Sequence, residues 1–199
     1  MVFRTDLAVE ARELLEKDIG GTDYFTQRYG DVTLTRLKIK TPEAAGKMGK
    51  PEGTYLTFDV PPFSDDFRDP AARIELIGKE LASLLPQRGL ILVAGLGNTE
   101  ITPDNLGPKT AKGVLATRHI TGELARSTGL DDLRPVAVLA PGVLGQTGIE
   151  TGELLYSVTQ KLRPAALIVV DALASRRLDR LGCTRSEEHT SELQSQRDI

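Results

Sequence analysis

Apolar and polar residues in the first third of the chain follow patterns that predict helices and strands. Residues 7–17 place leucines and a valine among charged residues at the spacing of a short amphipathic helix. Residues 32–39 and 54–60 are rich in residues that are favoured in β-sheets. We therefore expect one helix followed by two strands.

A proline-rich loop precedes the next predicted helix. Residues 61–70 read PPFSDDFRDP, in which Asp69 fits an N-cap and Pro70 fits the first helical position. The helix is expected to end before Pro86, because proline cannot continue a helix. Its predicted buried stripe consists of Ile74, Ile77, Leu81 and Leu84.

From residue 90 onward, short continuous apolar runs replace these periodic patterns. The runs cover residues 90–95, 135–142 and 165–172, and each is followed by glycines or turn residues. Continuous apolar runs suit strands that are covered on both faces, as in a parallel sheet. The chain is therefore predicted to be α/β, with a mostly parallel sheet flanked by helices. In such folds a functional site lies at the carboxyl ends of the strands.

Two crossover helices are expected between these strands. The first is predicted over residues 109–126, after Gly107 and Pro108. For the second, Thr147 and Glu150 have the spacing of a capping box, and Arg163-Pro164 marks the stop. Right-handed crossovers of this kind place all three strand ends at one edge of the sheet.

Composition narrows the possible functions without choosing among them. The 199 residues are 40% hydrophobic and 27% charged, which is ordinary for one soluble domain. A formal net charge of -3 gives no broad basic surface for nucleic acid. Cys183 is the single cysteine, and no cluster of cysteine and histidine predicts a metal site or a cofactor. The N-terminus lacks a secretory signal, and no run approaches the length of a membrane span, so we expect a cytoplasmic protein.

The C-terminal residues differ in character from the rest of the chain. Residues 185–195, RSEEHTSELQS, match codon by codon the translation of a common sequencing-adapter oligonucleotide. We therefore expect residues 185–199 to be derived from an adapter and Thr184 to be about the last natural residue of an incomplete gene fragment. A natural acidic tail is the alternative. Glu187, Glu188 and His189 are accordingly left out of any predicted site.

Two glycine-containing segments could bind a ligand through backbone N–H groups. GLGN at 95–98 follows a strand but is not a dinucleotide-binding turn, because Glu100 stands where the third glycine would be. PGVLGQTGIET at 141–151 combines three glycines with a helix start, which suits a carboxylate or an oxyanion. The candidate loop residues are Gly97, Asn98, Gly142, Gly145 and Gly148.

Two aspartates are the leading candidates for chemistry. Asp104 lies in the loop after the first apolar strand, where a role in a turn or a helix cap is the simpler interpretation. Asp171 directly follows the third strand and is expected to be partly desolvated, although it could instead cap a helix at 172–182. If both loops lie at one sheet edge, one carboxyl could hold a proton while the other polarises a water molecule. His119 is a weaker candidate, more typical of a helix surface or a helix end.

Five segments together resemble one family, the germination proteases. They are RTDLAVEA (4–11), VAGLGNTEITPDNLGPKT (93–110), TRHI (117–120), LAPGVLGQTGIET (139–151) and VVDALASR (169–176). The similarity covers nearly all of residues 4–184. It implies an endopeptidase of the forespore and spore core, homotetrameric and without a cofactor, in an α/β fold similar to hydrogenase-maturation proteases. The family's two proposed catalytic aspartates correspond by motif to Asp104, in TPD-x-LGP, and Asp171, in DALA.

The resemblance also implies a substrate and a maturation step. The substrates would be small acid-soluble proteins that coat spore DNA, cut after an acidic residue in sequences similar to TEFASE. A self-processing zymogen is implied, with cleavage between Asp6 and Leu7. We thus expect a propeptide remnant at 1–6, the N-terminal portion of one peptidase domain at 7–184, and the foreign tail. An inactive truncated fragment and a nickel-dependent maturation protease are the alternatives.

Overall fold

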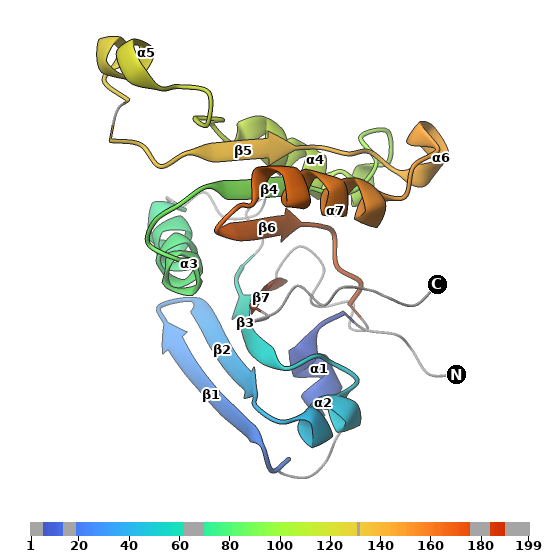
Figure 1. Ribbon diagram of the computed structural model, residues 1–199. Coiled ribbons are helices and arrows are strands. Elements are labelled where there is room, and N and C mark those ends of the chain that lie inside the picture. The colour runs from blue at the N-terminus through green and yellow to red at the C-terminus, as the bar shows by residue number, and fades with distance from the viewer. Residues whose placement is uncertain (1–5, 14–18, 62–69, 131, 176–183, 190–199) are drawn as a thin grey trace. The chain divides into compact units, whose positions relative to one another are not determined.

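A computed structural model describes residues 6–13, 19–61, 70–130, 132–175 and, for the backbone alone, 184–189 (Figure 1). The described residues form two compact units. One unit contains the residues up to Leu84 together with those from Leu173 onward, and the other contains Leu85–Ala172. In the described parts of the chain, every helix is too short or too polar to span a bilayer.

The first unit is built on an antiparallel sheet with the strand order β1-β2-β3-β7. The strands are β1 (Thr22–Tyr29), β2 (Val32–Ile39), β3 (Gly53–Asp59) and β7 (Thr184–His189). The strands predicted at 32–39 and 54–60 are confirmed as β2 and β3, the second displaced by one residue. Strand β1 was not predicted, because its side chains are mostly exposed and carry no apolar alternation. The boundary expected near residue 184 remains a prediction.

Strands β2 and β3 are covered on both faces, and the two-residue period of a strand assigns their side chains to these faces. Leu37, Ile39 and Tyr55 point to the face that packs against α1 (Ala8–Glu13) and α2 (Pro42–Met48). The alternate positions point to a second cluster, which includes residues of α3 (Ala71–Leu84). The core residues of this second face are Val32, Leu34, Leu56, Phe58 and Val60.

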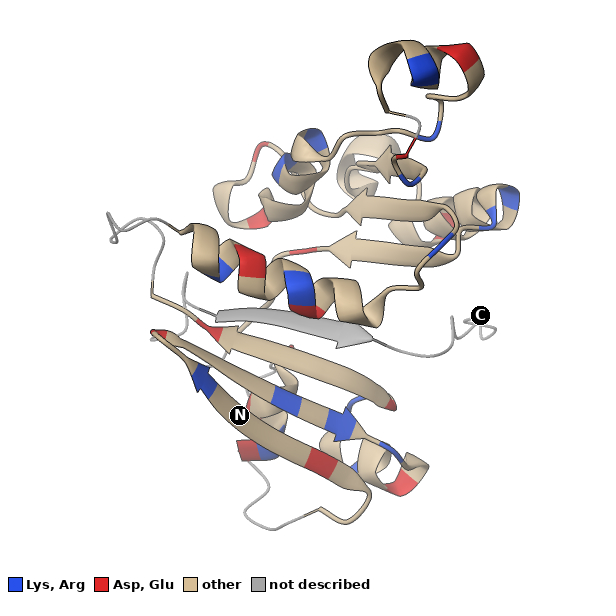
Figure 2. Ribbon diagram, turned by 90° about the vertical axis from the view of Figure 1, so that its left-hand side faces the viewer, with Lys and Arg blue, Asp and Glu red and all other residues tan. Residues whose placement is uncertain are grey.

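Helix α3 begins at Ala71, so Pro70, which was predicted to be its first residue, directly precedes the helix instead. Ile77 and Leu84 of the expected buried stripe pack against the second cluster as predicted, but Ile74 does not. Ile74 is 58% exposed, whereas Arg73 and Glu80 are buried. Arg73 forms an ion pair with Asp31, and Glu80 forms one with Arg36 of β2. Charged residues are spread along this helix and the antiparallel strands (Figure 2). The stripe thus combines apolar contacts with two ion pairs, which hydrophobic periodicity alone cannot reveal. Asp69, the predicted N-cap, lies outside the described residues.

The second unit contains a parallel sheet with the strand order β5-β4-β6. The strands are β4 (Ile91–Gly95), β5 (Val136–Leu139) and β6 (Ala166–Val170), and β4 pairs in parallel with both of the others. The arrows of β5 and β6 point the same way in Figure 1. A parallel sheet is therefore confirmed in a mixed α/β structure. The expected parallel sheet is found in this unit alone among the described residues, because the sheet of the first unit is antiparallel. Only the central strand β4 is fully buried; the edge strands β5 and β6 are largely half-buried.

The connections between these strands differ from the predicted helices in two places. Instead of one helix over 109–126, the chain forms α4 (Leu106–Gly113) and α5 (Gly122–Thr128), with an irregular segment between them. Instead of a capping box, the Thr147 hydroxyl accepts a hydrogen bond from the Ile149 N–H. Two helices, α6 (Leu144–Thr147) and α7 (Thr151–Leu162), follow β5. Helix α7 ends at Leu162 with Arg163 as its C-cap, which matches the predicted stop at Arg163-Pro164.

Candidate active site

Asp104 and Asp171 both lie at the carboxyl edge of the parallel sheet. Strands β4 and β6 pair so that Gly95 lies opposite Val170, and Asp171 is the next residue. The Leu96 N–H extends this pairing by donating to the Val170 carbonyl at 2.8 Å. Asp104 ends the short 3-10 helix Thr102–Asp104, within the loop that leaves β4 at the same edge. The condition stated for a carboxylate pair, that both loops share one sheet edge, is met.

Gly107 allows the start of α4 to pack directly against this edge of the sheet. A Cβ at this position would lie 2.2 Å from the Leu96 carbonyl oxygen and 2.4 Å from that of Val170, far inside van der Waals contact. Only glycine permits this approach of the helix to the two strand ends. Because Gly107 is three residues after Asp104 and packs on the residue before Asp171, it ties the two aspartate-bearing segments together.

The Asp104 side chain is held by the loop that follows β4. Its Oδ2 accepts a hydrogen bond from the Asn98 backbone N–H at 2.8 Å. Gly97 has a φ of 120°, and a Cβ there would lie 1.9 Å from the Asp104 carbonyl oxygen. A side chain at residue 97 would therefore push Asp104 away from the sheet edge. The two predicted loop residues, Gly97 and Asn98, thus shape the surroundings of Asp104.

Asn98 also links this loop to α6. The Asn98 Oδ1 accepts hydrogen bonds from the Glu100 backbone N–H at 2.9 Å and from Gln146 Nε2 at 3.0 Å. Gln146 stands between two of the predicted glycines in the sequence, but its link to Asn98 joins residues 48 positions apart. Sequence reasoning missed Gln146. Its position between Gly145 and Gly148 is the one signal that could have drawn attention to it.

Asp171 is more accessible than expected. Its side chain is exposed, and its Oδ1 accepts a hydrogen bond from the N–H of the next residue, Ala172, at 2.7 Å. The expectation of partial desolvation was wrong because β6 is an edge strand of the described sheet. No helix begins within residues 172–175, and the remainder of the helix expected at 172–182 lies outside the described residues.

The glycine-rich loop after β5 forms α6 and its two flanks. Gly142 precedes the helix, Gly145 lies within it, and Gly148 forms its C-cap with a φ of 69°. The Gly148 N–H donates to the Leu144 carbonyl at 2.8 Å and is therefore already used within the chain. If an N–H group of this loop binds an oxyanion, it must therefore belong to a residue other than Gly148.

The predicted processing site lies in the other unit and is firmly packed there. Asp6 and Ala174 exchange two hydrogen bonds: the Asp6 N–H donates to the Ala174 carbonyl at 3.0 Å, and the Ala174 N–H donates to Asp6 Oδ2 at 2.8 Å. Lys50 Nζ donates to the Asp6 carbonyl at 2.9 Å. Leu7 is 3% exposed, and Glu10 is fully buried with a hydrogen bond from the Ser175 hydroxyl. The Asp6–Leu7 bond is thus covered in this conformation.

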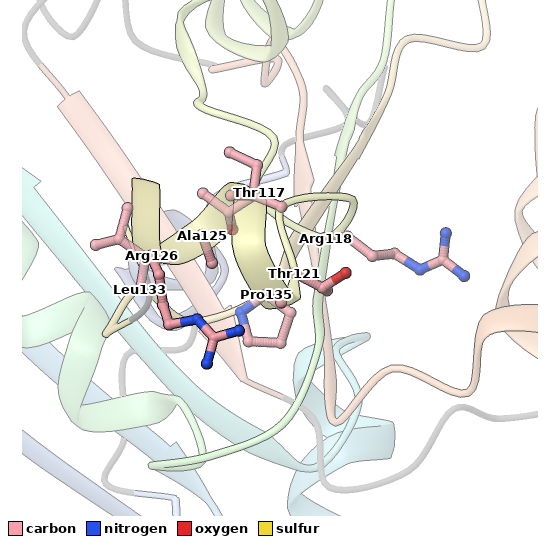
Figure 3. Close-up of a pocket in the computed structure, with 9 residues that line it drawn as sticks. Thr117, Arg118, Thr121, Ala125, Arg126, Leu133 and Pro135 are labelled. Carbon is pink, nitrogen blue, oxygen red and sulfur yellow. The ribbon is translucent and has the colours of Figure 1, made fainter. Parts of the chain in front are cut away.

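A pocket of about 500 Å³ lies at the opposite edge of the parallel sheet. Its rim includes Thr117 and Arg118, whose N–H groups donate to the carbonyl of Val136 at the start of β5 (Figure 3). The neighbouring His119 is exposed in a turn, not on a helix. Among the described residues, no three His, Cys, Asp or Glu side chains gather closely enough to hold a metal ion, so we assign no ligands. Cys183 lies outside the described residues.

Comparison with known proteins identifies relatives over nearly the whole chain. The sequence model of the family described as germination protease matches residues 3–190. The germination protease of Caldanaerobacter subterraneus is 40% identical over 186 residues, which cover 92% of this chain and 57% of that protein. A germination protease of Clostridium perfringens is 39% identical over 91% of this chain and 58% of the relative. For that of Bacillus cereus the identity is 36%, over 91% of this chain and 52% of the relative.

The chain spans a little more than half the length of each of these relatives. The family match covers β4 and β6 and the segments after them that contain Asp104 and Asp171. By the extent of the match and the level of identity, the chain belongs to the germination protease family.

Proposed function

We propose that this chain carries the catalytic residues of an endopeptidase that degrades small acid-soluble, DNA-binding proteins during spore germination. Membership of the germination protease family supports proteolysis in germination. The five segments that resemble the family support the substrate class and cleavage after an acidic residue. The same resemblance supports a homotetramer in the forespore and spore core and a fold related to hydrogenase-maturation proteases. The adapter-like sequence of residues 185–195 supports a foreign tail after Thr184.

The observation that carries the mechanism is the position of Asp104 and Asp171 after adjacent strand ends, joined through Gly107. We propose that one carboxylate takes a proton from a water molecule as the water oxygen attacks the scissile carbonyl carbon. The other carboxyl, protonated at the start, gives its proton to the leaving amide nitrogen as the C–N bond breaks. The two aspartates end with their protonation states exchanged, and proton exchange with solvent restores them.

The packing around Asp6 and Leu7 supports a latent precursor. A protease must reach the carbonyl of Asp6, but that oxygen already accepts a hydrogen bond from Lys50, and Leu7 is buried. We propose that the bond between Asp6 and Leu7 is cut only after this segment detaches from its contacts with Ala174 and Lys50. Local opening would then set the rate of maturation.

The test replaces each aspartate by the isosteric amide, Asp104→Asn and Asp171→Asn, and measures cleavage of a peptide containing Thr-Glu-Phe-Ala. The exposed Asp132→Asn serves as the matched control. The assay uses the 199-residue chain and an extended protein, in which residues 1–184 are followed by the remaining C-terminal part of the Caldanaerobacter relative. The first two variants should lose activity by about 10²- to 10⁴-fold while unfolding at the wild-type urea concentration. Normal cleavage by both, or no cleavage by either wild-type form, would overturn the proposal.

A further inference from the structure

The side-chain amide of Asn98 is held in one orientation at the candidate active site. Its Oδ1 accepts from the Glu100 backbone N–H at 2.9 Å and from Gln146 Nε2 at 3.0 Å. A backbone N–H can only donate, so the side-chain atom that faces Glu100 must be the oxygen. This fixes the nitrogen, Nδ2, on the other side of the amide.

The two N–H groups on Nδ2 are available to a ligand. Within the described part of the chain Nδ2 donates no hydrogen bond, and the Asn98 side chain is half-exposed. The backbone N–H of the same residue donates to Asp104 Oδ2 at 2.8 Å. A carbonyl group positioned for attack by a water molecule on Asp104 would therefore lie beside Asn98.

Peptide hydrolysis places a negative charge on the carbonyl oxygen as the tetrahedral intermediate forms. Donors that are already oriented stabilise this charge most strongly, because they need not reorganise during the reaction. The Gly148 N–H, one of the predicted loop donors, already donates a hydrogen bond to the Leu144 carbonyl and cannot donate to this oxyanion. The Asn98 side-chain amide has N–H groups that can donate to the oxyanion. Its orientation is fixed because two donors hold its oxygen.

We infer that Asn98 is a further catalytic residue, whose Nδ2 donates a hydrogen bond to the oxyanion of the scissile peptide. Gln146 is a positioning residue, which holds the Asn98 amide in the orientation that turns Nδ2 toward substrate. This inference rests on the proposed peptidase function. It assigns the two residues to separate tasks: Asn98 contacts the reacting oxygen, and Gln146 acts through Asn98.

The decisive variant is Asn98→Asp, because it keeps an oxygen acceptor for Glu100 and Gln146 but removes both donors. If Asn98 only supports the loop, this variant should cleave the peptide like wild type. If Asn98 donates to the oxyanion, kcat should fall about 100-fold or more with KM nearly unchanged. Thr99→Asp, which adds the same charge at the neighbouring exposed position, controls for the new carboxylate and should keep most of the activity.

Two further variants separate positioning from donation. Asn98→Ala should lose activity to a similar extent, whereas Gln146→Ala should lose about tenfold in kcat, the effect of one hydrogen bond that orients the amide. Urea unfolding and the KM of each variant are measured alongside, since a general loss of structure would move both.

The experiment distinguishes failure of this inference from failure of the proposed function. Both wild-type forms, the chain and the extended protein, are assayed first with the Thr-Glu-Phe-Ala peptide. If neither cleaves it, or if Asp104→Asn cleaves normally, the proposed function fails and this inference fails with it. If Asp104→Asn is inactive while Asn98→Asp retains the wild-type kcat, only the role of Asn98 is overturned. Loss of activity in Thr99→Asp equal to that in Asn98→Asp would also overturn it, because charge alone would then explain both.

Discussion

Helix α4 packs closely against the sheet edge at Gly107. The variant Gly107→Ala, which adds one methyl group there, tests whether this close packing is required. The added Cβ would lie 2.2 Å from the Leu96 carbonyl oxygen and 2.4 Å from the Val170 carbonyl oxygen. Optimal carbon contacts are near ~3.5 Å, so the helix must move by about 1 Å or the β4–β6 extension must open. Overpacking of this kind costs about 1–3 kcal/mol, and more where backbone atoms are the obstacle.

The same displacement should reach Asp104, which lies three residues before Gly107. A shift of about 1 Å in a catalytic group can cost about 100-fold in rate, so peptide cleavage should fall by more than the loss of stability explains. The matched control is Gly113→Ala in the same helix, where an added Cβ meets nothing within 4 Å. It should stabilise by about 0.4–1 kcal/mol by restricting the unfolded chain.

Urea unfolding followed by circular dichroism measures both variants, with the peptide assay run under native conditions. We expect opposite signs for the change in unfolding free energy at residues 107 and 113. If Gly107→Ala unfolded at the same urea concentration as Gly113→Ala and cleaved the peptide at the wild-type rate, Gly107 would not be required for the close packing of α4.

Two further predictions concern the framework around the site. Arg163, the C-cap of α7, has a φ of 47°, in the left-handed region. Glycine adopts this conformation without strain, so Arg163→Gly should stabilise the chain by up to about 1 kcal/mol. Unchanged or lower stability in urea would contradict that backbone conformation. Arg36→Leu removes the ion-pair partner of Glu80, whose side chain is 11% exposed, and should destabilise by about 1–3 kcal/mol, with recovery when Glu80→Leu is added. Additive effects in this double-mutant cycle would show that the pair contributes nothing.

Local sequence was sufficient to predict several elements. The continuous apolar runs predicted the three strands of the parallel sheet, and the proline after Arg163 predicted the end of α7, because neighbouring residues encode both signals. Local patterns did not predict β1, whose side chains are largely exposed. Ile74 was expected in a buried stripe, because local sequence does not show that Arg73 pairs with Asp31 of the β1–β2 turn and Glu80 with Arg36 of β2.

The sequence by itself determined the family and the two candidate aspartates, because motifs such as TPD-x-LGP and DALA are read from adjacent residues. Only the tertiary structure decided that Asp171 is exposed and that Gln146 holds Asn98 beside Asp104. The physical reason is that exposure and hydrogen bonding between residues 48 positions apart depend on strand order. Strand order sets which loops meet at the sheet edge, and no short segment encodes it.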